Sequence, residues 1–230
     1  MLNTENILKD LVKLFKEIGL AEEFRKYLNI AIPKYCFNLA MDNGKSIDDF
    51  TKDMEDSSTQ WTVFQTVRLS YEGVKSFFTY NANEFLKSKT NGNVKILTVK
   101  DLVDRGINVD SVSFDLVVEF YGEIIMLEMK VTQSKGGWQG STHSTSKVPN
   151  YFLILLDIDK EKVVNIGEEY VKGIFMMIDT FGESNWKGEA SNSNSRTGLS
   201  LITERDFSDA IICGELNTND KRKYYEIIVD

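Results

Sequence analysis

The chain of 230 residues is 42% hydrophobic and 11% aromatic, which is enough to bury a core and is unlike a disordered sequence. Its formal net charge of −8 speaks mildly against non-specific nucleic-acid binding, which depends on cations meeting phosphates, but leaves specific binding open. No apolar run nears the ~20 residues of a membrane helix, and the amphipathic, acidic N-terminus is unlike a signal peptide. Two cysteines without CxxC spacing and a single histidine argue against a zinc site and fit a cytosolic protein.

The first ninety residues have the apolar periodicity of helices. A first helix is expected over about 7–18, where apolar residues recur at helical spacing and Gly19 follows as a stop. A second helix is expected over about 21–31, ending near Pro33. The strongest helical pattern runs over 57–89 and is followed by a turn. The N-terminal part of the chain is therefore expected to be helical.

The pattern then changes to strands. Apolar stretches typical of strands lie at 94–99, 112–120, 123–131, 151–158 and 171–181. The second and third of these are separated by "YG" alone, which predicts a hairpin. A long polar loop and short helix or strand pieces follow them. The fold class expected is α/β with a mixed central sheet flanked by helices, in one domain. Its parts are a helical N-terminal part (1–56), a core (57–181), and a polar loop with C-terminal strands (182–230).

Charged residues interrupt the expected hairpin on one face. Because side chains alternate along a strand, Asp115 and Glu119 share a face of the first strand, and Glu128 and Lys130 share a face of the second. The opposite faces are apolar: Phe114, Leu116, Val118 and Phe120 on the first strand, and Ile125, Leu127, Met129 and Val131 on the second. Pairing the strands could bring Asp115 beside Glu128. Two carboxylates and an amine suit a divalent cation and a phosphate, although a solvated Lys–Glu pair would give the same short pattern.

Two short motifs of the hairpin carry a resemblance to a known family. Asp115 in "SFD" and the run from Glu128 to Lys130 in "LEMK", with the apolar strand "YFLILLD" after them, resemble the PD-(D/E)xK nuclease superfamily, especially its type II restriction endonucleases. The resemblance covers about residues 60–180. Phe114 stands where the family often has a proline, which weakens the recognition more than the chemistry. The resemblance implies a restriction-endonuclease-like core, in which a helix precedes an antiparallel hairpin and further strands.

The resemblance also implies roles for the individual residues. Asp115 and Glu128 would bind one or two Mg²⁺ ions, together with the main-chain carbonyl of Met129. Lys130 would position the attacking water and stabilise the charged phosphate. A glutamate on the preceding helix often completes such a site. Here Glu72 is the first choice for that role, and Glu84 is the alternative.

Two polar segments could contact DNA. The segment after the motif lysine offers Gln133, Lys135, Gln139, His143 and Lys147. The later loop offers Trp186, Lys187, Asn192, Asn194 and Arg196. Amides and cations of this kind suit phosphates and base edges, but ordinary solvated loops have the same composition.

The function expected is that of a Mg²⁺-dependent, site-specific endonuclease of type II restriction type. The resemblance implies a prokaryotic, cytoplasmic hydrolase of a restriction–modification system that leaves 5′-phosphate and 3′-hydroxyl ends. A palindromic site in double-stranded DNA would be matched by a homodimer. No membrane is expected as a partner. Two alternatives remain open: a repair or junction-resolving nuclease of the same fold, and a catalytically inert module that binds nucleic acid or protein.

Overall fold

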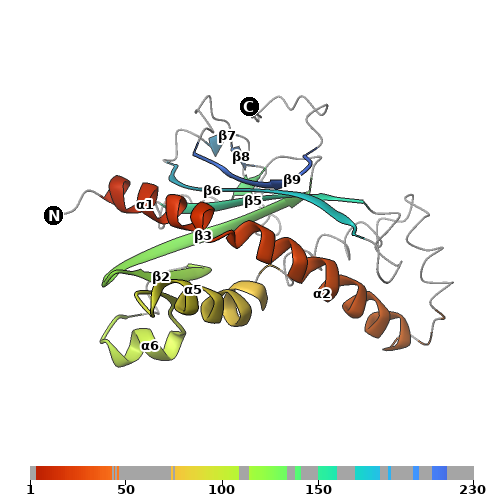
Figure 1. Ribbon diagram of the computed structural model, residues 1–230, viewed down its shortest axis with the longest axis horizontal. Coiled ribbons are helices and arrows are strands. Elements are labelled where there is room, and N and C mark those ends of the chain that lie inside the picture. Colours follow the sequence, from red (N-terminus) through yellow and green to blue (C-terminus); the bar gives the residue numbers. More distant parts are fainter. Residues whose placement is uncertain are drawn as a thin grey trace.

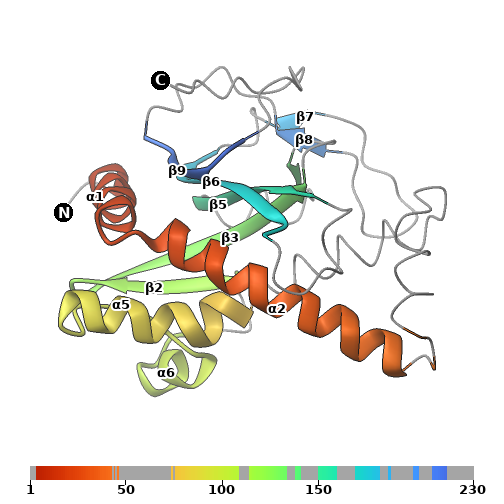
Figure 2. The same cartoon turned by 45° about the vertical axis from the view of Figure 1, so that its right-hand side comes forward.

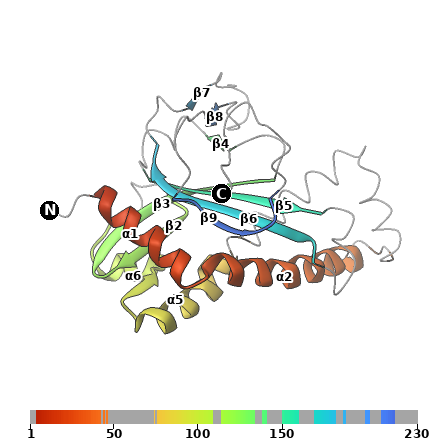
Figure 3. The same cartoon turned by 45° about the horizontal axis from the view of Figure 1, so that its top comes forward.

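The computed structural model describes residues 4–42, 44, 46, 74, 76–108, 114–133, 138–140, 150–159, 169–181, 186–187, 199–201 and 209–216. A six-stranded mixed sheet with the order β1-β2-β3-β5-β6-β9 forms its centre (Figure 1). Helices α1, α2 and α5 cover one face of this sheet, and a three-stranded sheet with the order β4-β8-β7 lies on the other side (Figure 3). The expected α/β class with a mixed central sheet is confirmed.

The helices match the predicted ones only in part. Their bounds are α1 Thr4–Glu17, α2 Leu20–Asp42, the π-helical turn η1 Phe77–Asn81, α5 Ala82–Thr90 and α6 Val99–Asp104. Gly19 separates α1 from α2 with a φ of 71°, as its role as a stop predicts. The predicted end of the second helix near Pro33 is wrong, because α2 continues to Asp42. A proline removes one backbone donor and one helical hydrogen bond, but it does not forbid helical turns on both sides.

The strands lie close to the predicted stretches. Their bounds are β1 Val94–Ile96, β2 Leu116–Phe120, β3 Glu123–Gln133, β4 Gln139–Gly140, β5 Asn150–Ile158, β6 Val171–Thr180, β7 Trp186–Lys187, β8 Leu199–Leu201 and β9 Ile211–Gly214. The β2–β3 hairpin is confirmed, and its two turn residues, Tyr121 and Gly122, both have positive φ. β3 and β5 pair in parallel, whereas the other pairs of the large sheet are antiparallel.

The stretch predicted as a strand over 94–99 divides into a strand and a helix start. β1 ends at Ile96, and Thr98 caps α6. The hydroxyl of Thr98 accepts a hydrogen bond from the backbone N–H of Asp101, whose carboxylate accepts one from the N–H of Thr98. This capping box ends the strand earlier than the apolar pattern indicates.

The main core lies between the helices and one face of the large sheet. It includes Leu11 and Phe15 of α1, Phe24 and Leu28 of α2, Phe77 and Phe78 of η1, Leu86 of α5, and Leu116, Val118, Ile125, Leu127, Met129, Phe152, Ile154 and Met176 of the sheet. The predicted apolar face of the hairpin is therefore confirmed, with one exception. Phe114 packs with Val117 on the other side, because the β2 ladder begins at Leu116 and strand alternation does not extend to residue 114.

Hydrogen bonds and ion pairs attach α2 to the sheet. The side-chain oxygen of Asn29 accepts bonds from the backbone N–H groups of Tyr170 (3.1 Å) and Val171 (2.9 Å), and the Tyr170 hydroxyl donates to the carbonyl of Leu28. Nearby, the thiol of Cys213 donates to the carboxylate of Glu22. Burial, with that contact, raises the pKa of the Cys213 thiol to about 11, so it stays protonated and unreactive at neutral pH. In Figure 2, α2 crosses the sheet and extends past it.

Two smaller apolar clusters lie on the face of the large sheet away from α2. One forms under α6 from Leu97, Leu102 and Val117, with Ile107, Phe114 and Met126 at its border. The other includes Trp138, Tyr151, Leu153, Leu155, Phe175, Met177 and Phe181. No helix in the described parts of the chain is long and apolar enough to cross a membrane.

Candidate active site

Asp115 directly precedes β2 and is fixed by two hydrogen bonds to β3. The register of the hairpin runs from Phe120 opposite Glu123 to Leu116 opposite Leu127, so Asp115 lies just beyond the last pair. The backbone N–H of Asp115 donates to the carbonyl of Leu127 at 3.1 Å. Its carboxylate accepts a hydrogen bond from the backbone N–H of Met129 at 3.0 Å. The β2–β3 pairing thus positions the carboxylate that the motif predicts.

The same bond indicates where the carbonyl of Met129 points. A residue in a strand directs its N–H and its C=O to the same neighbouring strand. The N–H of Met129 meets Asp115, so its carbonyl faces that side of β3 as well. This carbonyl lies beyond Leu127, the last β3 residue paired with β2. A main-chain oxygen and a carboxylate are therefore available at one place.

Glu128 and Lys130 form a shielded ion pair on the face of β3 away from the main core. The Lys130 ammonium contacts the Glu128 carboxylate, and the side chains of Lys130 and Glu128 are 18% and 9% exposed, respectively. Register places Glu128 beside Tyr151 and Lys130 beside Leu153 of β5. Both neighbours belong to the apolar Trp138 cluster.

This ion pair is not expected to contribute much to the stability of the fold. Removing two charges from water costs several kcal/mol per ion, which their attraction often fails to repay. The two charges also lie on a surface bordered by the α6 cluster and the Trp138 cluster. The pair is therefore weak evidence for a purely stabilising role.

The other acid of the hairpin has a different role. Glu119 lies near the turn and accepts contacts from Arg105 at 2.6 Å and Lys95 at 3.2 Å. The hydrogen bond from the Arg105 guanidinium holds the pKa of the Glu119 carboxyl below its usual range. The contact attaches the end of α6 to β2. Far from the turn, Glu128 and Lys130 pair with each other, and Asp115 bonds to the backbone of Met129, the residue between them.

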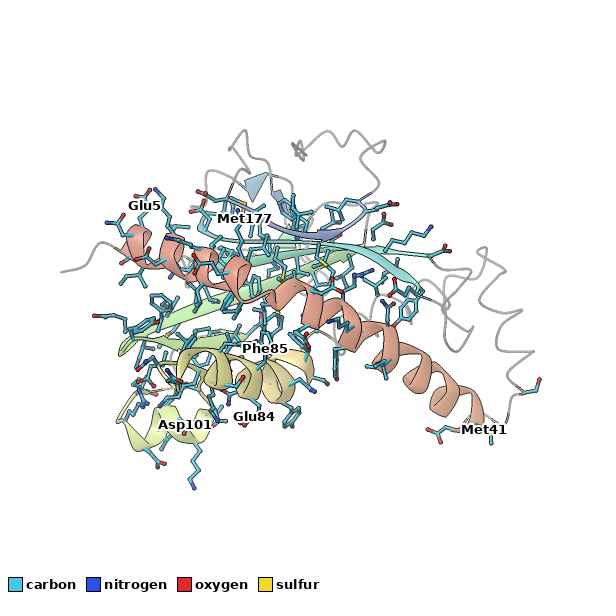
Figure 4. The ribbon with its side chains drawn as sticks, in the orientation of Figure 1. Glu5, Met41, Glu84, Phe85, Asp101 and Met177 are labelled. Carbon is cyan, nitrogen blue, oxygen red and sulfur yellow. The ribbon has the colours of Figure 1, made fainter. Side chains whose placement is uncertain are left out.

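The upstream acid is not brought to this site by the described residues. Glu84 lies on α5, where its side chain is 77% exposed and pairs with Lys87 at 3.0 Å. Figure 4 shows Glu84 at the outer side of α5, the helix that packs on the main-core face. Glu128 and Lys130 lie on the opposite face. Glu72, the first choice for this role, lies outside the described residues.

Several of the candidates for DNA contact belong to described strands, where only their backbones are placed. Gln133 ends β3, Gln139 begins β4, and Trp186 and Lys187 form β7. The predicted contacts that lie outside the described residues are Lys135, His143, Lys147, Asn192, Asn194 and Arg196. β8 joins β4 to β7, so two segments nearly fifty residues apart in the sequence enter one sheet.

Trp138 is the residue that sequence reasoning overlooked. It is 1% exposed, and its indole N–H donates to the carbonyl of Ile154 in β5 at 3.0 Å. It thereby anchors the start of β4 to the large sheet, on the face that carries Glu128 and Lys130. The signal was a single tryptophan within an otherwise polar, glycine-containing run, a composition that predicts a loop.

The donor atoms at the site fit Mg²⁺ by their chemistry. Mg²⁺ takes one or two carboxylates and keeps water and phosphate oxygens as its other ligands. Asp115, Glu128 and the carbonyl of Met129 supply hard oxygen atoms of this kind. Among the described residues, no group of three or more His, Cys, Asp or Glu side chains could hold a metal ion. Of the described residues, these two carboxylates and the main chain are the groups that would hold a metal here.

Comparisons with known proteins found no family model, no curated protein and no solved structure that matches this chain. The function of the chain therefore rests on its own residues, on their geometry and on the motif they resemble.

Proposed function

We propose that the protein is a Mg²⁺-dependent, site-specific endonuclease that cleaves double-stranded DNA, of the type II restriction kind in the PD-(D/E)xK superfamily. One observation carries the proposal: the carboxylate of Asp115 is fixed against the β3 backbone at Met129, the residue between the members of the shielded Glu128–Lys130 pair. The three motif residues thus belong to one hairpin. An arrangement needed only for packing would have no use for three charges there.

The reaction is the hydrolysis of a phosphodiester. A water molecule attacks phosphorus, the bond from phosphorus to the 3′ oxygen breaks, and that oxygen takes up a proton, which leaves a 5′-phosphate and a 3′-hydroxyl. Lys130 positions the attacking water and stabilises the negative charge that develops on the phosphate oxygens. Its contact with Glu128 holds the ammonium in place before DNA binds. The apolar clusters on both sides reduce the access of bulk water, which strengthens these interactions.

Asp115, Glu128 and the carbonyl of Met129 are the groups that would hold Mg²⁺. The ion supplies Lewis-acid polarisation of the phosphoryl oxygen and neutralises charge in the transition state. The bond from the Met129 N–H orients the Asp115 carboxylate, which would contribute an oxygen ligand to the ion.

The order of the elements supports the restriction-endonuclease-like core. α5 precedes an antiparallel unit of β1, β2 and β3, as the resemblance implies. The parallel strand β5 then extends the sheet next to the catalytic strand. We further propose that the enzyme acts as a homodimer on a palindromic site in the prokaryotic cytoplasm.

The test is incubation of the purified protein with a large DNA of known, mixed sequence, in Mg²⁺ and in chelator. We expect discrete fragments with Mg²⁺ alone, whose mapped ends give the recognition site and the stagger. Lys130→Ala should slow cutting at least about 100-fold while the fold and DNA binding persist. Lys13→Ala, an exposed lysine of α1 on the other side of the sheet, is the matched control.

Other outcomes would decide against the proposal in different ways. Cutting confined to branched or damaged DNA would indicate a repair or junction-resolving nuclease. Full activity in Lys130→Ala would show that the site is assigned wrongly. If the wild-type protein cleaves no DNA and no RNA, the restriction and the repair nuclease are both rejected. The remaining alternative is then an inert module that binds nucleic acid or protein.

A further inference from the structure

The Glu128 carboxylate is almost removed from water, which is unusual for an acidic side chain. Its side chain is 9% exposed. Along β3, the neighbours of Glu128 on the same face are Met126 and Lys130, because side chains alternate. The pairing of β2 with β3 ends one residue earlier, at Leu127. The strand that continues alongside Glu128 is β5, on the other side of β3.

Tyr151 of β5 is the residue that lies beside Glu128. The two residues are register partners in the parallel pairing of β3 with β5. Adjacent strands lie about 4.8 Å apart, and paired residues direct their side chains to the same face of the sheet. The side chain of Tyr151 is fully buried, including its hydroxyl. A large aromatic side chain therefore covers the β5 side of the Glu128 carboxylate.

The ring of Tyr151 is held in place by the apolar cluster to which it belongs. Phe181 meets it edge to face, with the ring centroids 6.4 Å apart. Trp138 packs in the same cluster, and its indole N–H donates to the carbonyl of Ile154 at 3.0 Å, which ties the cluster to β5. A tyrosine side chain has only two main rotatable bonds, so a ring packed in this way forms a rigid wall.

We infer that Tyr151 is a positioning residue of the candidate metal site, whose ring keeps the Glu128 carboxylate in place and in an environment poor in water. The inference rests on the proposed function and adds a residue that lies outside the motif. The apolar surroundings of a metal site control the access of water, and groups that orient the ligands change metal affinity by about 10- to 100-fold. Where water is excluded, a carboxylate also attracts a divalent cation more strongly.

The first experiment measures the binding of Mn²⁺ without DNA, by electron paramagnetic resonance of the free ion, because Mn²⁺ takes the same oxygen ligands as Mg²⁺. Tyr151→Leu should raise the dissociation constant about tenfold, whereas Tyr151→Phe, which keeps the ring, should bind like the wild type. Phe175→Leu is the matched control. Phe175 is equally buried in the same cluster, but it lies on β6, two strands away from Glu128.

The second experiment titrates Mg²⁺ in the cleavage of mixed-sequence DNA. Tyr151→Leu should need about ten times more Mg²⁺ for half-maximal cutting, with a rate at saturating Mg²⁺ close to that of the wild type. A general loss of structure would instead lower the rate at every Mg²⁺ concentration. Thermal unfolding checks that each variant is folded. Tyr151→Met, which fills more of the space, takes the place of Tyr151→Leu if that variant does not fold.

The outcomes separate this inference from the proposed function. If the wild type cuts DNA but Tyr151→Leu keeps its affinity for Mn²⁺ and its Mg²⁺ requirement, Tyr151 only packs, and the nuclease remains. The inference is also overturned if Phe175→Leu has the same effect as Tyr151→Leu, or if Tyr151→Phe does, since the ring would then not be the cause. If the wild type neither binds Mn²⁺ nor cuts DNA, the proposed function fails and the inference falls with it.

Discussion

Asp115 has two tasks, which a single substitution can separate. Its carboxylate accepts a hydrogen bond from Met129 at 3.0 Å, and its charge is proposed to bind the metal. Asp115→Asn keeps an oxygen acceptor for the bond but loses the charge. We expect cleavage of mixed-sequence DNA to fall by on the order of 100-fold or more, because a metal ligand is lost, while the unfolding midpoint in urea stays near that of the wild type.

Asp115→Ala removes both the hydrogen-bond acceptor and the negative charge, and it serves as the comparison. It should lose cleavage to the same extent and, in addition, cost about 1 kcal/mol of stability, because the Met129 N–H loses its acceptor. If Asp115→Asn still cuts DNA at the wild-type rate, Asp115 is only an anchor for the backbone.

At the scale of single residues, the alternation of side chains along the strands predicted the apolar face of the hairpin. It could not show which of the acidic residues on the other face belong to the candidate site. Glu119 and Glu128 both lie on the face away from the main core, and their immediate sequence contexts are similar. What separates them is Arg105, which reaches Glu119 from α6. That contact depends on where α6 packs, and a hydrophobic pattern carries no such information. Phe114 was misplaced for a related reason, since a pairing that starts at Leu116 is set by the partner strand.

Among the elements, α6 depends most on its cap. It has only six residues, and isolated helices of that length are not stable in water. Thr98 closes its first turn by accepting the Asp101 N–H, and Leu102 then packs against Leu97 and Val117. Thr98→Ala should therefore lower the free energy of unfolding by about 1 kcal/mol, measured in urea.

The matched control for the cap is Lys100→Ala, at an exposed position of the same helix. It keeps the cap and improves helix propensity slightly, so its stability should stay within about 0.5 kcal/mol of the wild type. Equal losses in both variants would mean that α6 is held by packing alone.

The boundaries of elements were predictable where local chemistry sets them. Gly19 and the Tyr121–Gly122 turn lie where their sequence signals indicate, because positive φ is a local requirement. The capping box at Thr98 was also visible in the sequence, but the apolar run of β1 masked it. The extension of α2 past Pro33 was not visible, because the penalty of one proline is smaller than the sum of the contacts that hold a long helix.

For the whole molecule, pairing between distant segments was the part that the sequence could not supply. The parallel neighbours β3 and β5 need a crossover, and nothing local indicates that they are adjacent. In the sheet of β4, β8 and β7, β4 and β7 come from two polar segments that were interpreted as loops, and β8 comes from the stretch after 198 that was expected to hold short helix or strand pieces. Strands of two or three residues carry too little periodicity to be detected. This long-range pairing decides which distant segments enter one sheet.

The large sheet separates the face that packs against α1, α2 and α5 from the face that carries Glu128 and Lys130, and this separation makes a last prediction possible. Asn29 joins α2 to the sheet by accepting two backbone N–H bonds, from Tyr170 and Val171. Asn29→Ala leaves both donors without this acceptor and should lower the free energy of unfolding by about 2 kcal/mol in urea. Ile30→Ala, at a side chain that is 72% exposed, should change it by no more than about 0.5 kcal/mol.

The activity of the same variant tests the division itself. Asn29 lies on the face opposite Glu128 and Lys130, so Asn29→Ala should cut DNA at close to the wild-type rate at temperatures well below its unfolding. Asn29→Asp, which keeps an acceptor oxygen for both N–H groups, should recover most of the lost stability. A variant that stays folded but loses cleavage would show instead that α2 and the hairpin are coupled through the sheet. The two faces would then act as one unit, since the core residues Leu28 and Met129 lie in the same packed layer between them.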